Sequence, residues 1–112
     1  MTDKTDPLGV PVSSRAPEIG AVLAEVYAVL EQRKRDLPED SYTAKLLMGP
    51  QDKLLKKIGE ESAELIIAAR DGDPKQLRYE LGDLLYHMLV VMVREGVELD
   101  DLAAELYSRR RK

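Results

Sequence analysis

Five acidic residues in two groups have the spacing needed to bind a divalent cation. Glu60, Glu61 and Glu64 form the first group, and Glu80 and Asp83 form the second. At about 100° per residue of an α-helix, Glu60 and Glu64 lie about 40° apart, and Glu61 about 60° beyond Glu64. Glu80 and Asp83 are also about 60° apart. If the two helices pack antiparallel, the carboxylates converge, repel one another and are costly to desolvate. The pattern therefore predicts a bound cation.

The alternative is that these acids form an ordinary solvated helix face. Two details favour the cation. The acidic stripe borders the apolar face, and Asp83 directly precedes residues 84–93, which contain no Asp, Glu, Lys or Arg. Oxygen ligands in a chain without cysteine favour Mg²⁺, with Mn²⁺ as the second choice, over zinc or copper. A di-iron bundle needs Glu-x-x-His twice, whereas this chain has one histidine and Tyr86 follows Asp83 by three residues.

Two other side chains near the acids each have two interpretations. His87 lies one turn after Asp83, so it could be a metal ligand or a core histidine bonded to a carboxylate. Lys57 lies one turn before Glu60 and Glu61, so it could pair with them or reach a substrate phosphate held by the metal. The spacing alone does not choose between these roles.

The apolar period and the breaker residues predict five helices. We expect them over residues 18–35, 41–47, 51–70, 74–95 and 99–109. Asp40 or Ser41 should cap the short helix at 41–47. The consecutive residues Gly72, Asp73 and Pro74 should separate the two helices that carry the acids. Residues 1–16 have no apolar period and several breakers, so we expect a flexible tail before a single domain at 17–112.

The apolar segment at 84–93 predicts a subunit interface. Residues 84–93 are apolar nearly all round, and such a helix must be covered on every side. We therefore expect an oligomer in which Val90→Glu or Val93→Glu gives monomeric or unfolded protein. The apolar face of the helix at 51–70 is predicted to consist of Leu54, Leu55, Ile58, Leu65, Ile66 and Ala69.

Composition restricts the class of protein. The 112 residues suffice for one all-α domain, and the net charge of −4 argues against non-specific nucleic-acid binding. No apolar run reaches the length of about 18–20 residues that a membrane span needs. Without a signal-like N-terminus, a cytoplasmic location is expected. The basic run at 109–112 suits a solvated helix end.

Several segments carry a resemblance to a known family. GEESAE at 59–64 followed by ELGD at 80–83 resembles the EExxE…ExxD signature of the all-α, MazG-like nucleotide pyrophosphohydrolases. With SYTAKLL (41–47), KIGEE (57–61), DLLYHMLV (83–90) and GVELDDLAAEL (96–106), residues 18–110 resemble the phosphoribosyl-ATP pyrophosphohydrolases of histidine biosynthesis. Gly82 and Glu98 depart from the usual alanine and serine-type cap. The lack of cysteine and of spare length predicts a form without the zinc-binding cyclohydrolase domain to which the family is sometimes fused.

The resemblance implies a four- to five-helix MazG-like bundle that forms an intertwined dimer or higher oligomer. It also implies Mg²⁺-dependent hydrolysis of phosphoribosyl-ATP to phosphoribosyl-AMP and pyrophosphate. The implied roles are metal binding by Glu61, Glu64, Glu80 and Asp83, catalysis by Glu60 or Glu61, and substrate binding by Tyr42, Lys45 and Lys57. The alternatives are a house-cleaning pyrophosphohydrolase acting on a triphosphate such as dCTP or dUTP, and a non-catalytic helical dimer that serves as a scaffold.

Overall fold

The computed structural model describes residues 17–37, 39 and 41–110, which form five helices and no strand. The helices are α1 (Ile19–Asp36), α2 (Tyr42–Met48), α3 (Gln51–Asp71), α4 (Pro74–Glu95) and α5 (Leu99–Arg109). Each boundary lies within one residue of the predicted one, so the predicted all-α fold is confirmed. The predicted tail at 1–16 lies outside the described residues. In the part of the chain that the structure describes, no helix is both long and apolar enough to cross a membrane.

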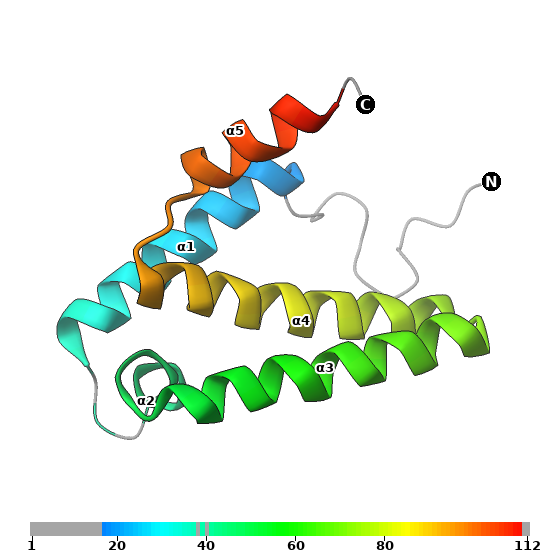
Figure 1. The fold of residues 1–112 in the computed structure, drawn as a ribbon, viewed down its shortest axis with the longest axis horizontal. Coiled ribbons are helices and arrows are strands. Elements are labelled where there is room, and N and C mark those ends of the chain that lie inside the picture. Colours follow the sequence, from blue (N-terminus) through cyan, green and yellow to red (C-terminus); the bar gives the residue numbers. More distant parts are fainter. Residues whose placement is uncertain (1–16, 38, 40, 111–112) are drawn as a thin grey trace.

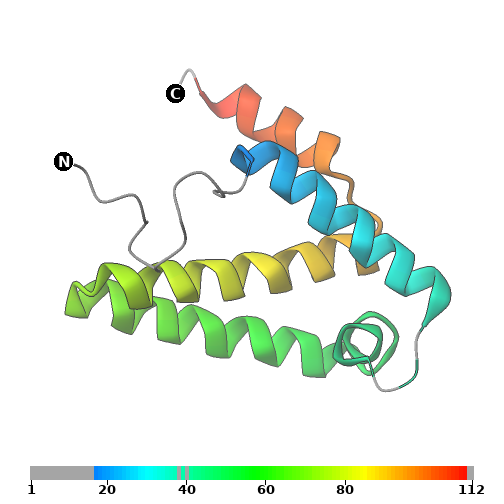
Figure 2. The same ribbon diagram turned by 180° about the vertical axis from the view of Figure 1, so that it is seen from behind.

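The two acid-bearing helices form an antiparallel hairpin. Figures 1 and 2 show α3 and α4 side by side, with α1 crossing α4 at an angle, α5 beside α1, and α2 near the first turn of α3. The sequence explains the tight turn. Gly72 adopts the left-handed conformation that ends α3, with φ of 70°. The Asp73 side chain then accepts hydrogen bonds from the first N–H groups of α4, and Pro74 occupies its first position.

The core lies where α1, α2, α3 and α4 meet. Its most deeply buried side chains are Leu30, Leu46, Leu47, Leu54 and Val90. Each such side chain contributes about 1.5–3 kcal/mol of hydrophobic stabilisation relative to its exposed state. The short helix α2 is thereby fixed in place although it has only seven residues. Ser41 begins it by accepting a hydrogen bond from the Ala44 N–H, so Ser41 is the cap, and Asp40 lies outside the described residues.

Three long-range hydrogen bonds to backbone carbonyls tie the end of α4 to α1 and α2. The Tyr27 hydroxyl donates to the Val97 carbonyl over 2.7 Å, and the Lys34 ammonium group donates to that of Val93 over 3.1 Å. Arg94 donates to the Leu46 carbonyl over 2.8 Å. The first two bonds hold α1, and the third holds α2, against the end of α4 that follows the acids.

The expected role of Val90 and Val93 as interface residues is wrong. Their exposed fractions are 0% and 4% within the single chain, because α1, α2 and α3 already cover them. A glutamate at either position would place a charge in the core of one subunit. It would unfold the protein and would not test an interface.

The predicted apolar face of α3 is also partly wrong. Leu54 is buried as expected, but Leu55 is 47% exposed and Ile66 is 67% exposed. The stripe that faces α4 runs instead through Leu54, Glu61 and Ala68, which are the buried residues of α3. The hairpin thus packs along the flank that carries an acid and leaves much of the neighbouring apolar flank uncovered.

Candidate metal centre

Three of the predicted metal ligands converge between α3 and α4. Glu61 and Glu64 come from α3 and Glu80 from α4, and one carboxylate oxygen of each lies within 4.8 Å of the other two. Glu61 and Glu80 are buried, with exposed fractions of 2% and 5%, whereas Glu64 lies at the exposed rim. The antiparallel turn at 72–74 produces this arrangement because it places the middle of α3 opposite the first half of α4.

Two buried oxygens in this cluster have no hydrogen-bond partner. They are Oε2 of Glu61 and Oε1 of Glu80. The other oxygens of these residues are satisfied: Glu61 Oε1 lies 3.2 Å from the Lys57 ammonium nitrogen, and Glu80 Oε2 accepts a 2.7 Å hydrogen bond from the Gln76 amide. A buried polar atom without a partner costs about 1–3 kcal/mol. A cation would remove both deficits at once.

The donor set fits a hard divalent cation. All three groups offer carboxylate oxygens, the ligands that Mg²⁺ and Mn²⁺ prefer. Two oxygens bound to one Mg²⁺ at about 2.1 Å can lie at most about 4.2 Å apart. The three oxygens lie within 4.8 Å of one another, so small side-chain rotations suffice to bring them around one ion.

Asp83 adjoins this cluster through Glu61. Burial raises the pKa of Asp83, and the neighbouring Glu61 carboxylate raises it further. Burial also acts to raise the pKa of Glu61, but Asp83 and the Lys57 ammonium group outweigh it and leave that pKa lowered. Asp83 is thus the member of the pair that holds a proton more readily. The charges of Glu80 and Glu61 raise the pKa of Glu64.

His87 is buried but is not bonded to a carboxylate side chain. Its Nδ1 lies 2.7 Å from the backbone carbonyl oxygen of Asp83, and its Nε2 lies 3.1 Å from the Tyr42 hydroxyl. Both ring nitrogens are therefore hydrogen-bonded, and metal binding by His87 would require one of these bonds to be given up. The expected carboxylate partner is wrong, because the bond goes to the backbone of Asp83.

The other predicted site residues are only partly brought together. Tyr42 lies beside the acids, since Lys57, Asp83 and Glu61 all influence the pKa of its phenol. Lys57 pairs with Glu61, as one of its two interpretations required. Glu60 and Lys45 are exposed, and no recorded contact joins either side chain to the three-carboxylate cluster.

Gln76 was missed from the sequence. Its amide donates to Glu80 Oε2 and fixes the direction of that carboxylate. The signal that could have found it is its place one turn before Glu80 on the same helix, where a glutamine commonly bonds an acid. Gln76 therefore supports the site through Glu80.

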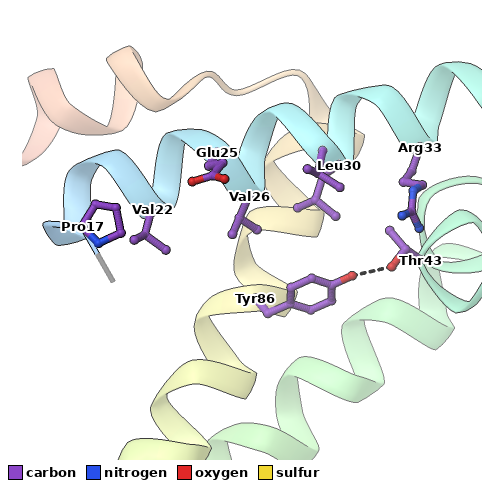
Figure 3. Close-up of a pocket in the computed structure, with 9 residues that line it drawn as sticks. Pro17, Val22, Glu25, Val26, Leu30, Arg33, Thr43 and Tyr86 are labelled. Carbon is purple, nitrogen blue, oxygen red and sulfur yellow. Dashed lines mark hydrogen bonds between the residues drawn. The ribbon is translucent and has the colours of Figure 1, made fainter. Parts of the chain in front are cut away.

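A groove with mostly apolar walls lies away from the acids. Figure 3 shows it between α1 and α4, with a volume of about 540 Å³. Tyr86 and Thr43 line it, and their hydroxyl groups are hydrogen-bonded to each other. A smaller hollow of about 150 Å³ opens at the acidic cluster and is lined by Glu64, Ile67, Ala68, Asp71, Gln76 and Glu80. Another, of about 320 Å³, is lined by Arg78, Tyr79, Gly82 and Asp83 of α4.

Comparison with known proteins gives the family. Residues 23–110 match the family described as phosphoribosyl-ATP pyrophosphohydrolase. A phosphoribosyl-ATP pyrophosphatase of Haloarcula marismortui is 46% identical over 95 residues, which cover 83% of this chain and 97% of that protein. One from Leptospira biflexa is 46% identical over 87 residues, covering 78% of this chain and 95% of the relative.

A longer relative matches over part of its length. The histidine biosynthesis bifunctional protein HisIE of Thermus thermophilus is 44% identical over 94 residues, which cover 84% of this chain and 44% of that protein. The residues that match the family, 23–110, contain both acid-bearing helices and α2. The chain belongs to the phosphoribosyl-ATP pyrophosphohydrolase family.

Proposed function

We propose that this protein hydrolyses phosphoribosyl-ATP to phosphoribosyl-AMP and pyrophosphate. A water oxygen forms a bond to the α-phosphorus, the bond from that phosphorus to the pyrophosphate oxygen breaks, and the water loses a proton to a base. One observation carries the proposal: two buried carboxylate oxygens, on Glu61 and Glu80, lack a partner where a family of triphosphate hydrolases would need a cation. A scaffold would have no use for this deficit.

The chain's acids would hold Mg²⁺, or Mn²⁺ in its place. Glu61, Glu64 and Glu80 supply the converging oxygens, and Asp83, which adjoins Glu61, becomes available once it is deprotonated. When bound, the ion would neutralise triphosphate charge and make an attacking water more acidic. Glu60 is exposed next to Glu61 and is suited to accept the proton. Glu61 is the other candidate base.

Lys57, Lys45 and Tyr42 are proposed to bind the substrate. The Lys57 ammonium nitrogen is 3.2 Å from Glu61 in the metal-free protein, so it already acts as a counter-charge inside the site. A cation that took over the charge of Glu61 would free Lys57 to turn to a phosphate oxygen. Lys45 is exposed on α2, the helix that also carries Tyr42.

We also propose that two copies assemble through the uncovered apolar flank of the α3–α4 hairpin. Leu55 and Ile66 of α3 are 47% and 67% exposed, and Leu81 and Met88 of α4 are 49% and 46% exposed. Leu81 and Met88 are seven residues apart, so they share one face of α4. Exposed apolar residues gathered on two adjoining helices are typical of a subunit interface. A stable interface covers about 800 Å² on each partner.

The test is pyrophosphate release at several Mg²⁺ concentrations from phosphoribosyl-ATP, dCTP and dUTP. We expect turnover of phosphoribosyl-ATP that stops in EDTA and returns with added Mg²⁺ or Mn²⁺. Preference for the free deoxynucleotides would instead indicate a house-cleaning enzyme, and the absence of release from all three would indicate a scaffold. Glu105→Gln is the matched control, because Glu105 is an exposed acid on α5 whose partner is Arg109.

A further inference from the structure

His87 connects the metal centre to α2. It is the one histidine of the chain and is only 3% exposed. One ring nitrogen contacts the backbone of Asp83 on α4, and the other contacts the hydroxyl of Tyr42 at the start of α2. A buried imidazole with both nitrogens bonded to different helices holds those helices in register.

The hydrogen-bond partners determine where the protons lie. A backbone carbonyl oxygen can only accept, so His87 Nδ1 carries the hydrogen and donates it to Asp83 over 2.7 Å. In the neutral ring Nε2 then presents a lone pair. The Tyr42 hydroxyl, 3.1 Å away, donates to that lone pair. Burial raises the pKa of Tyr42, which keeps this donor protonated at neutral pH.

Tyr42 has an anchored hydroxyl and a largely free ring. The residue is 49% exposed, although its hydroxyl is tied to buried His87 and its ring meets the imidazole edge-on at 6.1 Å. The same hydroxyl lies within the electrostatic influence of Lys57, Asp83 and Glu61. A flat aromatic surface is thus fixed in direction at the edge of the acidic cluster. Such surfaces stack favourably on nucleobases.

We propose that His87 is a positioning residue that fixes the Tyr42 ring as a wall for the purine base of the substrate. This proposal rests on the proposed function, since it assigns the nucleoside end of the same site. Asp83 places His87 through its carbonyl group, so the metal centre and the purine wall share one hydrogen-bonded chain. We call the hydrogen bond between the Tyr42 hydroxyl and His87 Nε2 the Tyr42 tether. Without it the ring rotates freely, and the affinity for the substrate falls about three- to tenfold, the factor that one ordinary hydrogen bond supports.

The structure supplies a matched control one residue along each helix. The Tyr86 hydroxyl is bonded to the Thr43 hydroxyl, so this pair also ties α4 to α2. Figure 3 shows that it faces the groove beside α1. Tyr86→Phe therefore removes an α2–α4 hydrogen bond without touching the Tyr42 tether. Any effect of loosening α2 in general should appear in this variant too.

The tether itself can be read without any enzyme assay. Because the untagged chain has one histidine, long-range ¹H–¹⁵N spectra of its imidazole need no further assignment. We expect the tautomer with hydrogen on Nδ1, and a shift of the Nε2 resonance in Tyr42→Phe but not in Tyr86→Phe. The opposite tautomer, or an Nε2 resonance unmoved by Tyr42→Phe, overturns the proposal.

Kinetics then test the purine wall. Tyr42→Phe and His87→Phe should each raise KM for phosphoribosyl-ATP about three- to tenfold. Because both remove the same hydrogen bond, KM of the double variant should not exceed the higher of the two single-variant values. Inhibition by pyrophosphate, which has no base, should be unchanged in Tyr42→Phe, and Tyr86→Phe should keep the wild-type KM. The purine wall is refuted if Tyr42→Phe loses as much affinity for pyrophosphate as for phosphoribosyl-ATP. It is also refuted if the effects of Tyr42→Phe and His87→Phe on KM add up in the double variant, or if Tyr86→Phe raises KM as much as Tyr42→Phe does. No turnover by the wild type refutes the proposed function and the substrate half of this inference together, while the imidazole spectra still judge the tether.

Discussion

Glu80→Gln should stabilise the metal-free protein while it removes the response to Mg²⁺. Glu80 is 5% exposed, and its Oε1 has no hydrogen-bond partner. Glutamine has nearly the same shape, and its amide oxygen can still accept the bond from Gln76 that Glu80 Oε2 accepts over 2.7 Å. Its NH₂ group would occupy the place of the unpartnered oxygen and donate to the carboxylates of Glu61 or Glu64. A repulsive contact is thus replaced by an attractive one.

The size of the effect follows from the single unpartnered oxygen. Relieving one such atom is worth about 1–3 kcal/mol. For a domain of this size, each 1 kcal/mol raises Tm by about 4–8 °C. We therefore expect Tm of Glu80→Gln in EDTA to exceed that of the wild type by at least about 4 °C. Removal of an acid normally costs stability where the acid is paired, so the sign of the change is informative.

Mg²⁺ should reverse the comparison. A ligand that binds only the folded state at a hundred times its Kd adds about 2.7 kcal/mol of stability. The wild type should gain this amount and Glu80→Gln should gain almost none, because one of its three converging oxygens has lost its charge. Thermal unfolding followed by circular dichroism, with EDTA and with Mg²⁺, measures both effects.

Glu105→Gln controls for a general effect of removing an acid. Glu105 pairs with Arg109 over 2.8 Å on exposed α5. The free energy of unfolding of Glu105→Gln should therefore differ from that of the wild type by less than about 0.5 kcal/mol in either condition. A Glu80→Gln protein less stable than the wild type in EDTA would show that the charge of Glu80 is satisfied in the metal-free state. A full Mg²⁺ response in that variant would show that Glu80 is not a ligand.

Asp83→Asn should fold normally yet lower turnover at limiting Mg²⁺ by at least about a hundredfold, and Glu61→Gln should do the same; near-normal kcat would contradict their assignment as ligands. Lys45→Ala should raise KM for phosphoribosyl-ATP more than it lowers kcat and leave Mg²⁺ affinity unchanged, which steady-state kinetics and a Mg²⁺ titration check. Met88→Glu should give a folded monomer in sedimentation, and a wild type that is itself monomeric would contradict the proposed interface. Because the folded pKa of Asp83 is raised, its stabilising contribution is present at acidic pH and lost as pH rises through that pKa. In EDTA, Tm of Asp83→Asn should therefore fall less than that of the wild type as the pH rises above about 4, the ordinary pKa of an aspartate, and parallel curves would contradict the raised pKa.

The helices could be predicted because their signals are local. Gly72, Asp73 and Pro74 each impose a backbone conformation or supply a cap at their own position, and the structure places them as expected. Convergence of Glu61 and Glu80 followed from the helical period and one antiparallel turn. No information from distant parts of the chain was needed.

The packing partners could not be predicted, because α3 has two adjoining flanks with apolar residues. The period marks Leu55 and Ile66 as hydrophobic, but it does not say whether the same subunit or another molecule covers them. The same limit led to the wrong placement of Val90 at an interface. The partner of His87 was hidden for a different reason, since its bond goes to a backbone carbonyl, which every residue has.

The position of Lys57 relates the acids to the order of binding. Lys57 forms the only ion pair recorded with Glu61 among the described residues, and it is itself half-buried. Its pKa is raised by the hydrogen bond with Glu61, so it remains a cation throughout the neutral range. A divalent ion between α3 and α4 competes with Lys57 for Glu61, and a triphosphate competes with Glu61 for Lys57. Each ligand therefore weakens the contact that opposes the other. Metal and substrate should bind with positive coupling for this reason alone, with no movement of the helices.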